Sequence, residues 1–449
     1  MRSALAIALV LVASTAAQAS AQSVVIGGAD PEAYSLDLRY AERGAGVLSG
    51  RERIDFVNRG PAELDRVWLR LWANGPDRCE PRRIRVAVDA PALAGLERVR
   101  CSALEVLLPT PVAAGAAGSI SLSFTIRGRR ESDRFGRIGT TVLLGNVIPV
   151  LAVEDAGGLH LEPYTAFGES FYSLSASWDA EIRLPARLRA ATTGAVTSDT
   201  VAAGKRLVAV RSTQARDFAL AIGRLRTREA SAAGVRVRVH YEPGQGRVRA
   251  SMRHARRAVR LLSRRIGPYD SPELDVVLIR GGPRDMLAGM EYPELVFTLP
   301  IADVVAHEVA HQWWYGLVGN NQFAEPWLDE SFAQYSHERL YPLTNFCRAG
   351  RPYELVSPRR RHIPLDASMG VFDRASPAAI GEVVYLAGSC ALQTLERRIG
   401  RARMTTFLRS LQTRHRHGVM TKWDVQRAIR DAAPRLRLSR WLRDAHLSP

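Results

Sequence analysis

The fold of this chain is decided by HEVAHQWW at residues 307–314 and by WLDESFA, which follows at residues 327–333. Residues four positions apart lie on one face of a helix, so His307 and His311 can present two imidazole nitrogens to one metal ion. Glu308 lies one position round from that face, where a general base can reach a water molecule without binding the metal. Catalytic zinc sites typically have three protein ligands. The second stretch supplies the third at Glu330, because the Gly- and Asn-rich turn at residues 316–321 lets two helices meet.

Two further segments extend this pattern, GMEY at residues 289–292 and VYLAG at residues 384–388. In this order the four motifs resemble those of the gluzincin zinc aminopeptidases, the family of aminopeptidase N and the leukotriene hydrolase, here as a short, secreted, bacterial-type member. The resemblance implies one Zn²⁺ per chain, bound by His307, His311 and Glu330. It also implies a general base at Glu308, an oxyanion donor at Tyr385, and a substrate-binding segment made of Gly289, Met290 and Glu291.

A carboxylate beside the metal explains how such a site selects its substrate. Glu291 can recognise a free α-ammonium group at short range, and it offers nothing comparable to an uncharged internal residue. The alternative interpretation, without the resemblance, is that Glu291 is a surface residue at a strand end and that Tyr385 is a core residue of an amphipathic helix. The family often adds a second amine-binding residue from its β domain, and the segment at residues 161–169 is expected to supply it, although no single residue stands out.

The chain also departs from the family pattern at several positions. Tyr292 stands where Asn is usual, Leu386 and Ala387 replace a charged pair, and Ser331 replaces a common Gly. These departures bear on substrate preference more than on the metal site. Asp329 and Asn321 could orient the ligand histidines, but helix capping and turn formation are the more ordinary roles for these residue types.

The composition is that of a globular protein with two or three domains. The chain has 449 residues, 46% of them hydrophobic and 24% charged, and a net charge of +17. Almost all of its positively charged side chains are arginines. An arginine-rich solvated surface explains this charge, and attraction to anionic envelope polymers or acidic peptides is the sharper alternative. No nucleic-acid-binding module is recognisable, so we expect no nucleic-acid partner.

The first 21 residues are expected to be a cleaved export signal. Arg2 precedes a short apolar run and small residues follow it, which is typical of secretory signals. We therefore expect a periplasmic or secreted protein without a stable membrane anchor. Four cysteines in an exported chain can form the pairs Cys79–Cys101 and Cys347–Cys390, or can remain buried thiols.

The two halves of the chain have different patterns. At residues 120–127 apolar and polar residues alternate, as in a half-buried strand, and the segments 36–40, 54–58, 66–72 and 207–211 are similar. At residues 235–241 another strand precedes a helical spacing over 252–266, and a further strand follows at 274–279. These patterns predict an α+β protein: an all-β sandwich or saddle domain at residues 22–226, then a thermolysin-like domain at residues 227–449, mixed α/β and later helical.

The function predicted from the sequence is a secreted zinc metallopeptidase that removes N-terminal residues from peptides with a free N-terminus. The alternatives are a zinc endopeptidase and a catalytically silent peptide-binding envelope protein on the same fold. The natural substrate, the side-chain preference and the oligomeric state are not readable from the sequence.

Overall fold

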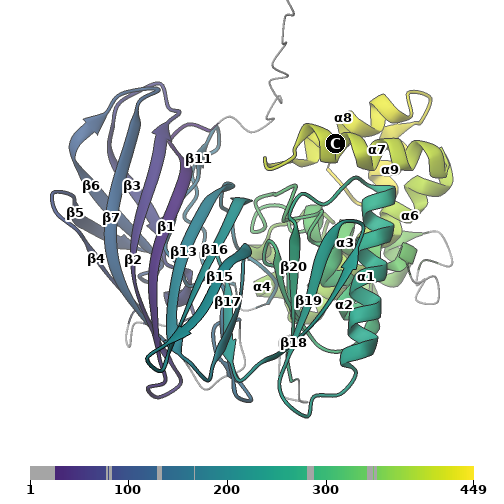
Figure 1. The fold of residues 1–449 in the computed structure, drawn as a ribbon. Coiled ribbons are helices and arrows are strands. Elements are labelled where there is room, and N and C mark those ends of the chain that lie inside the picture. Colours follow the sequence, from purple (N-terminus) through teal and green to yellow (C-terminus); the bar gives the residue numbers. More distant parts are fainter. Residues whose placement is uncertain are drawn as a thin grey trace, which may run out of the picture.

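The computed structural model describes residues 26–76, 79, 83–128, 134–165, 167–280, 288–340, 347 and 351–448. The expected export signal, residues 1–21, lies outside this range. An all-β half is followed by a mixed and then helical half, which confirms the predicted α+β fold class (Figure 1).

The β half is a sandwich whose sheets share one apolar core. Its largest sheet has the order β15 (Ala195–Ala202), β16 (Lys205–Ala215), β13 (Ala176–Pro185), β1 (Ala29–Ala41), β2 (Val47–Asn58), β7 (Ala117–Arg127), β4 (Ile84–Val88). A second sheet comprises β10 (Val150–Leu151), β3 (Leu64–Arg70), β6 (Ala103–Val112) and β5 (Leu93–Arg98). A third comprises β14 (Arg189–Thr192), β17 (Leu220–Gly223), β9 (Thr141–Leu144) and β8 (Arg137–Ile138), and β11 (Glu154–Asp155) pairs with β12 (Gly158–Leu159).

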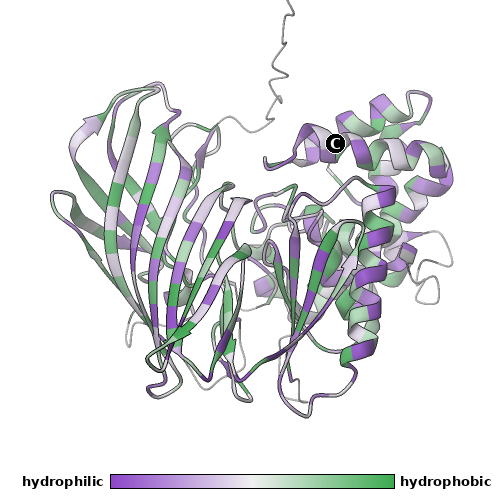
Figure 2. Ribbon diagram, in the orientation of Figure 1, coloured by the Kyte–Doolittle hydropathy of each residue, from purple (hydrophilic) through white to green (hydrophobic). Residues whose placement is uncertain are grey.

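Alternating side chains build this sandwich. Hydrophilic and hydrophobic bands alternate along β1, β2 and β7 (Figure 2), because successive residues of a strand point to opposite faces. Ile120, Leu122, Phe124 and Ile126 all point into the core. The strand predicted at residues 66–72 lies two residues earlier: β3 runs from Leu64 to Arg70, and a 3₁₀ turn, Trp72–Asn74, follows.

The second half opens with a five-stranded sheet in the order β18 (Arg226–Ala232), β19 (Val235–Tyr241), β20 (Glu273–Leu278), β22 (Leu295–Thr298), β21 (Gly289–Met290). The strands β19, β20 and β22 are parallel, and β21 runs antiparallel at the end of the order. Val276 packs with helices α1 (Val248–Arg265) and α2 (Ala302–Ala310), whereas its neighbour Val277 joins the core of the β half. Both faces of β20 are therefore buried, as is usual for an inner strand of a parallel sheet. The domain boundary at residues 226/227 stays a prediction.

Helices dominate the described residues that follow α2: α3 (Trp327–Leu340), α4 (Met369–Ala375), α5 (Pro377–Ile380), a π-helix (Gly381–Ala387), α6 (Gly388–Ile399), α7 (Arg401–Arg414), α8 (Lys422–Ala432) and α9 (Leu438–Asp444). The helix that carries His307 begins at Ala302. A capping box formed by Thr421 and Asp424 is present at the start of α8. Among the described residues, only Pro377–Ile399 has the length and apolarity of a membrane span. Of its most apolar stretch of 18 residues, 72% is buried inside the protein.

Covalent and ionic links hold distant segments together. Both cysteine pairs, Cys79–Cys101 and Cys347–Cys390, are disulfide-bonded. Arg216, which directly follows β16, is buried, and its guanidinium donates to the carbonyl oxygens of Ser173 (3.1 Å), Tyr315 (2.7 Å) and Gly418 (3.0 Å). One cation thus joins the β half to two segments of the second half. A Cβ at Gly319 would lie 2.3 Å from the guanidinium carbon, so glycine is needed there.

Candidate metal centre and active site

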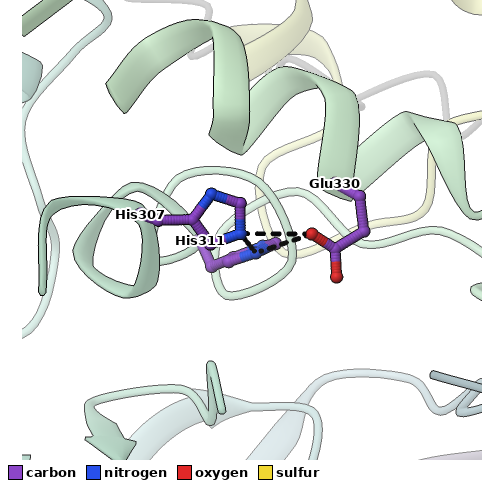
Figure 3. A group of neighbouring side chains, drawn as sticks. All are labelled: His307, His311 and Glu330. Carbon is purple, nitrogen blue, oxygen red and sulfur yellow. Dashed lines mark hydrogen bonds and ion pairs between the residues drawn. The ribbon is translucent and has the colours of Figure 1, made fainter. Parts of the chain in front are cut away.

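The two predicted zinc-ligand stretches come together at the ends of α2 and α3 (Figure 3). His307 lies in the last turn of α2, His311 follows that helix, and Glu330 lies in the first turn of α3. The His307 and His311 Nε2 atoms are 3.0 Å apart, and they lie 3.2 Å and 3.4 Å from one oxygen of Glu330. Three Lewis bases therefore face one point.

This arrangement fits a zinc ion. Ligand atoms around tetrahedral zinc, with bonds of about 2.0–2.2 Å, are about 3.3 Å from one another. The Nδ1 atom of His311 lies 3.0 Å from the carbonyl oxygen of Trp314. Because a carbonyl only accepts hydrogen bonds, Nδ1 carries the proton and Nε2 keeps its lone pair toward the metal position.

The electrostatics of the triad also favour a cation. Burial alone would raise the pKa of Glu330, but His311 and His307 hold it well below its ordinary value. Burial opposes a charge on His311, yet the nearby carboxylates of Glu330, Glu291 and Glu308 raise its pKa well above normal. The carboxylates thus stabilise positive charge at this position.

The predicted general base, Glu308, is buried beside the triad. It is 5% exposed, and burial raises the pKa of its carboxyl well above the ordinary value. One of its oxygens lies within 4.8 Å of ligand atoms of both His311 and Glu291. Gly289 makes the space for this side chain, because a Cβ there would lie 2.0 Å from Glu308 Oε1. The neighbouring Met290 is buried in the core of the β half.

A second carboxylate group adjoins the triad. Ligand oxygens of Glu169, Glu291 and Glu330 all lie within 4.8 Å of one another. Burial raises the pKa of Glu169, and Glu291 and Glu330 raise it further, whereas Arg134 lowers it. Burial also raises the pKa of Glu291. The segment expected to contribute a second amine-binding residue, 161–169, therefore brings Glu169 to Glu291.

Gln322 holds Glu291 in place and was missed by sequence reasoning. Its side-chain amide donates to Glu291 Oε1 (3.0 Å) and to Asp329 Oδ2 (2.7 Å), and its backbone N–H donates to the carbonyl of Phe171. Asp329 also accepts from the backbone N–H of Glu330 at 2.9 Å, so it supports the start of α3. A lone glutamine in a turn has no sequence pattern that would have identified it.

Asn321 lies in an interdomain contact. Its amide donates to Glu162 Oε1 (3.3 Å), which lies 2.7 Å from His160 Nδ1, and Asp155 lies 2.8 Å from Nε2 of the same ring. Burial lowers the pKa of His160, but the two carboxylates outweigh it and raise the pKa to about 9. Asn321 therefore links the β half to the turn before α3.

Tyr385 lies on the π-helix and faces the metal position. Its ring stacks on that of His307, with centroids 5.7 Å apart and planes 23° apart. Burial raises the pKa of the Tyr385 phenol well above its ordinary value, and the charges of Glu330 and Glu169 add to the effect. The hydroxyl therefore stays protonated and able to donate.

The departure at Tyr292 has a structural explanation. The Tyr292 hydroxyl donates to Asn146 Oδ1 at 3.1 Å, inside the contact between the two halves. A Cβ at Gly145 would lie 1.8 Å from this hydroxyl, so Gly145 makes room for the tyrosine. Tyr292 thus packs against the β half.

Comparison with known proteins shows which families this part of the chain is similar to. Residues 282–441 match the Peptidase family M1 domain. Aminopeptidase B of Rattus norvegicus is 35% identical over 82 residues, and leukotriene A-4 hydrolase of Xenopus laevis is 33% identical over 82 residues. Each match covers 16% of this chain, and it covers only 12% and 13% of the length of these two relatives.

Solved structures share the whole fold. An M1 zinc metallopeptidase from Deinococcus radiodurans has a TM-score of 0.68 at 22% identity, covering 96% of this chain and 97% of that chain. A mutant M1 zinc metallopeptidase from the same organism, bound to a Tyr-Ser-Ala substrate, has a TM-score of 0.66 at 20% identity, covering 96% of this chain and 98% of that chain. Residues 282–441 therefore match the M1 peptidase family, in agreement with the gluzincin aminopeptidase family that the motifs predict, and this match supports Zn²⁺ as the cofactor.

Proposed function

We propose that this protein is a zinc aminopeptidase that removes residues from the free N-terminus of peptides. The observation that carries the proposal is the pair of carboxylates, Glu169 and Glu291, within 4.8 Å of the metal ligand Glu330. A substrate ammonium group placed between them would meet two negative charges in a largely buried site, where such contacts are strong.

The residues around the metal have complementary tasks. Bound Zn²⁺ supplies Lewis-acid chemistry, polarising the scissile carbonyl and acidifying water. Glu308 takes the proton from the attacking water and later gives it to the leaving amine, a role suited to a carboxylate whose pKa is raised by burial. The Tyr385 hydroxyl donates to the oxygen of the scissile carbonyl as negative charge develops on it.

The edge of the five-stranded sheet gives the substrate a place to lie. β21 ends the order of this sheet among the described strands, and it consists of Gly289 and Met290, next to Glu291. An edge strand offers backbone groups to an extended peptide. A peptide substrate bound along β21 would place its N-terminus at Glu291. Endopeptidase action is disfavoured, because an internal peptide would leave the two glutamates without a cation.

We also propose that the protein works outside the cytoplasm. The apolar stretch after Arg2 supports export. The disulfides Cys79–Cys101 and Cys347–Cys390 fit an oxidising compartment.

The test is hydrolysis of a panel of aminoacyl-amidomethylcoumarins, with N-acetylated versions of the same compounds beside them. We expect release only from the free-amine substrates, its loss on adding a zinc chelator, and its return on adding zinc. Glu308→Gln should keep one zinc per chain and lose several orders of magnitude in kcat. Cleavage of blocked peptides alone would establish the endopeptidase, and silence of the zinc-loaded protein on every peptide would leave only a binding role.

A further inference from the structure

A buried serine connects the metal ligand to the tyrosine across two helices. Ser331 follows Glu330 in α3 and is fully buried. Its hydroxyl donates to the carbonyl oxygen of Val384 at 2.6 Å. Val384 directly precedes Tyr385, so this hydrogen bond joins the chain neighbours of Glu330 and Tyr385.

The contact depends on a close approach of the two helices. A Cβ at Gly388, the first residue of α6, would lie 2.0 Å from Ser331 Oγ and 2.7 Å from Ser331 Cβ. No other residue type fits opposite Ser331. Serine and glycine together therefore fix the distance between α3 and the helix that carries Tyr385.

The Ser331 hydroxyl donates to a carbonyl inside the π-helix that carries Tyr385. Entering and leaving π geometry changes which N–H each carbonyl meets, and such segments often lie at functional sites. A buried carbonyl needs a hydrogen-bond partner, and Ser331 supplies one to Val384 inside the π-helix Gly381–Ala387. Removing the hydroxyl would loosen the turn that orients Tyr385.

We infer that Ser331 is a positioning residue, which holds the Tyr385 hydroxyl in register with the metal ligand Glu330. This inference rests on the proposed function, in which Tyr385 donates to the scissile carbonyl oxygen. A serine that only packed two helices would affect stability without acting through Tyr385. The two roles are separable by experiment.

The kinetic test combines Ser331→Ala with Tyr385→Phe. We expect Ser331→Ala to lower kcat about tenfold, the factor that corresponds to one buried hydrogen bond of about 1.4 kcal/mol, with KM and zinc content unchanged. In the Tyr385→Phe background the same change should cost nothing more, because there is no hydroxyl left to position. An equal loss in both backgrounds would overturn the inference.

The matched control is Thr394→Val. Thr394 is also buried, and its hydroxyl donates to the carbonyl of Ala391 at 2.7 Å within α6. The control removes one buried side-chain hydrogen bond without touching the contact between Ser331 and Val384. We expect its kcat to stay within twofold of the wild type.

Hydrogen exchange gives a readout that needs neither zinc nor turnover. In the zinc-free protein, Ser331→Ala should speed exchange of the amides at residues 381–388 about tenfold and leave those of α7 unchanged. If the wild type hydrolyses no peptide, the proposed function fails, and exchange alone then decides the inference. Unchanged exchange at residues 381–388 would overturn it.

Discussion

Replacing Gly289 by alanine would displace the general base without altering its chemistry. The added Cβ would lie 2.0 Å from Oε1 and 2.2 Å from Cδ of Glu308. Because ordinary contact begins near 3.4 Å, the carboxylate must retreat by about 1.4 Å. Gly289 does not have a positive φ, so the effect is steric and not one of backbone strain. Neither partner can move away easily, since Glu308 is buried and β21 is paired with β22.

A misplacement of about 1 Å at a reacting group costs about 100-fold in rate. We therefore expect Gly289→Ala to lower kcat about 100-fold on a free-amine coumarin substrate, with one zinc per chain retained because Glu308 is not a ligand. Zinc content by mass spectrometry would accompany the kinetics. Gly246→Ala is the matched control, since nothing lies within 4 Å of a Cβ at that position. A Gly289→Ala enzyme with full zinc and at least half of the wild-type kcat would refute the reasoning.

Three further predictions concern charge. Glu291→Gln should lower kcat/KM on free-amine substrates about 10- to 100-fold, which corresponds to the free energy of one charged hydrogen bond. Any hydrolysis of N-acetylated substrates should stay unchanged, and an equal loss on both would contradict the assigned role. Because the pKa of His160 rises from 6.5 to about 9 on folding, its contribution to the free energy of unfolding is complete below pH 6.5 and disappears as the pH rises through 9. At this partly exposed site the loss should be about 1 kcal/mol in urea titrations, and a His160→Gln variant with the same pH profile would argue against it. Arg216→Met should lower the free energy of unfolding by about 3–5 kcal/mol, since three buried carbonyls lose a charged donor; a change below 1 kcal/mol would show that these bonds matter little.

The metal site could be predicted from the sequence because its ligands are close in the chain. His307 and His311 share one helix face, and Glu330 follows after one turn, so local periodicity is sufficient. Glu169 could not be singled out, because it reaches the site from the β half and its own segment also contains Glu162. Only the folded chain shows that Glu162 pairs with His160 while Glu169 turns toward Glu291.

The fold shows the same division between local and distant information. Long strands such as β2 and β7 carry enough alternation to be recognised, whereas β8 and β10 have two residues each and carry no period. The π-helix that carries Tyr385 was equally hidden, because one widened turn does not alter the apolar pattern of a helix. Its geometry depends on Ser331, which belongs to another helix.

The Arg216 contact has a consequence for how the chain is made. The guanidinium belongs to the β half, yet the carbonyls of Tyr315 and Gly418 leave the ribosome much later. Until Gly418 has been synthesised, the guanidinium lacks one of its three carbonyl acceptors, so the full contact between the two halves can form only late in synthesis. Grafting the metal-binding half onto another β scaffold would therefore require an equivalent of this arginine, because the carbonyls of Tyr315 and Gly418 would otherwise lose their shared donor.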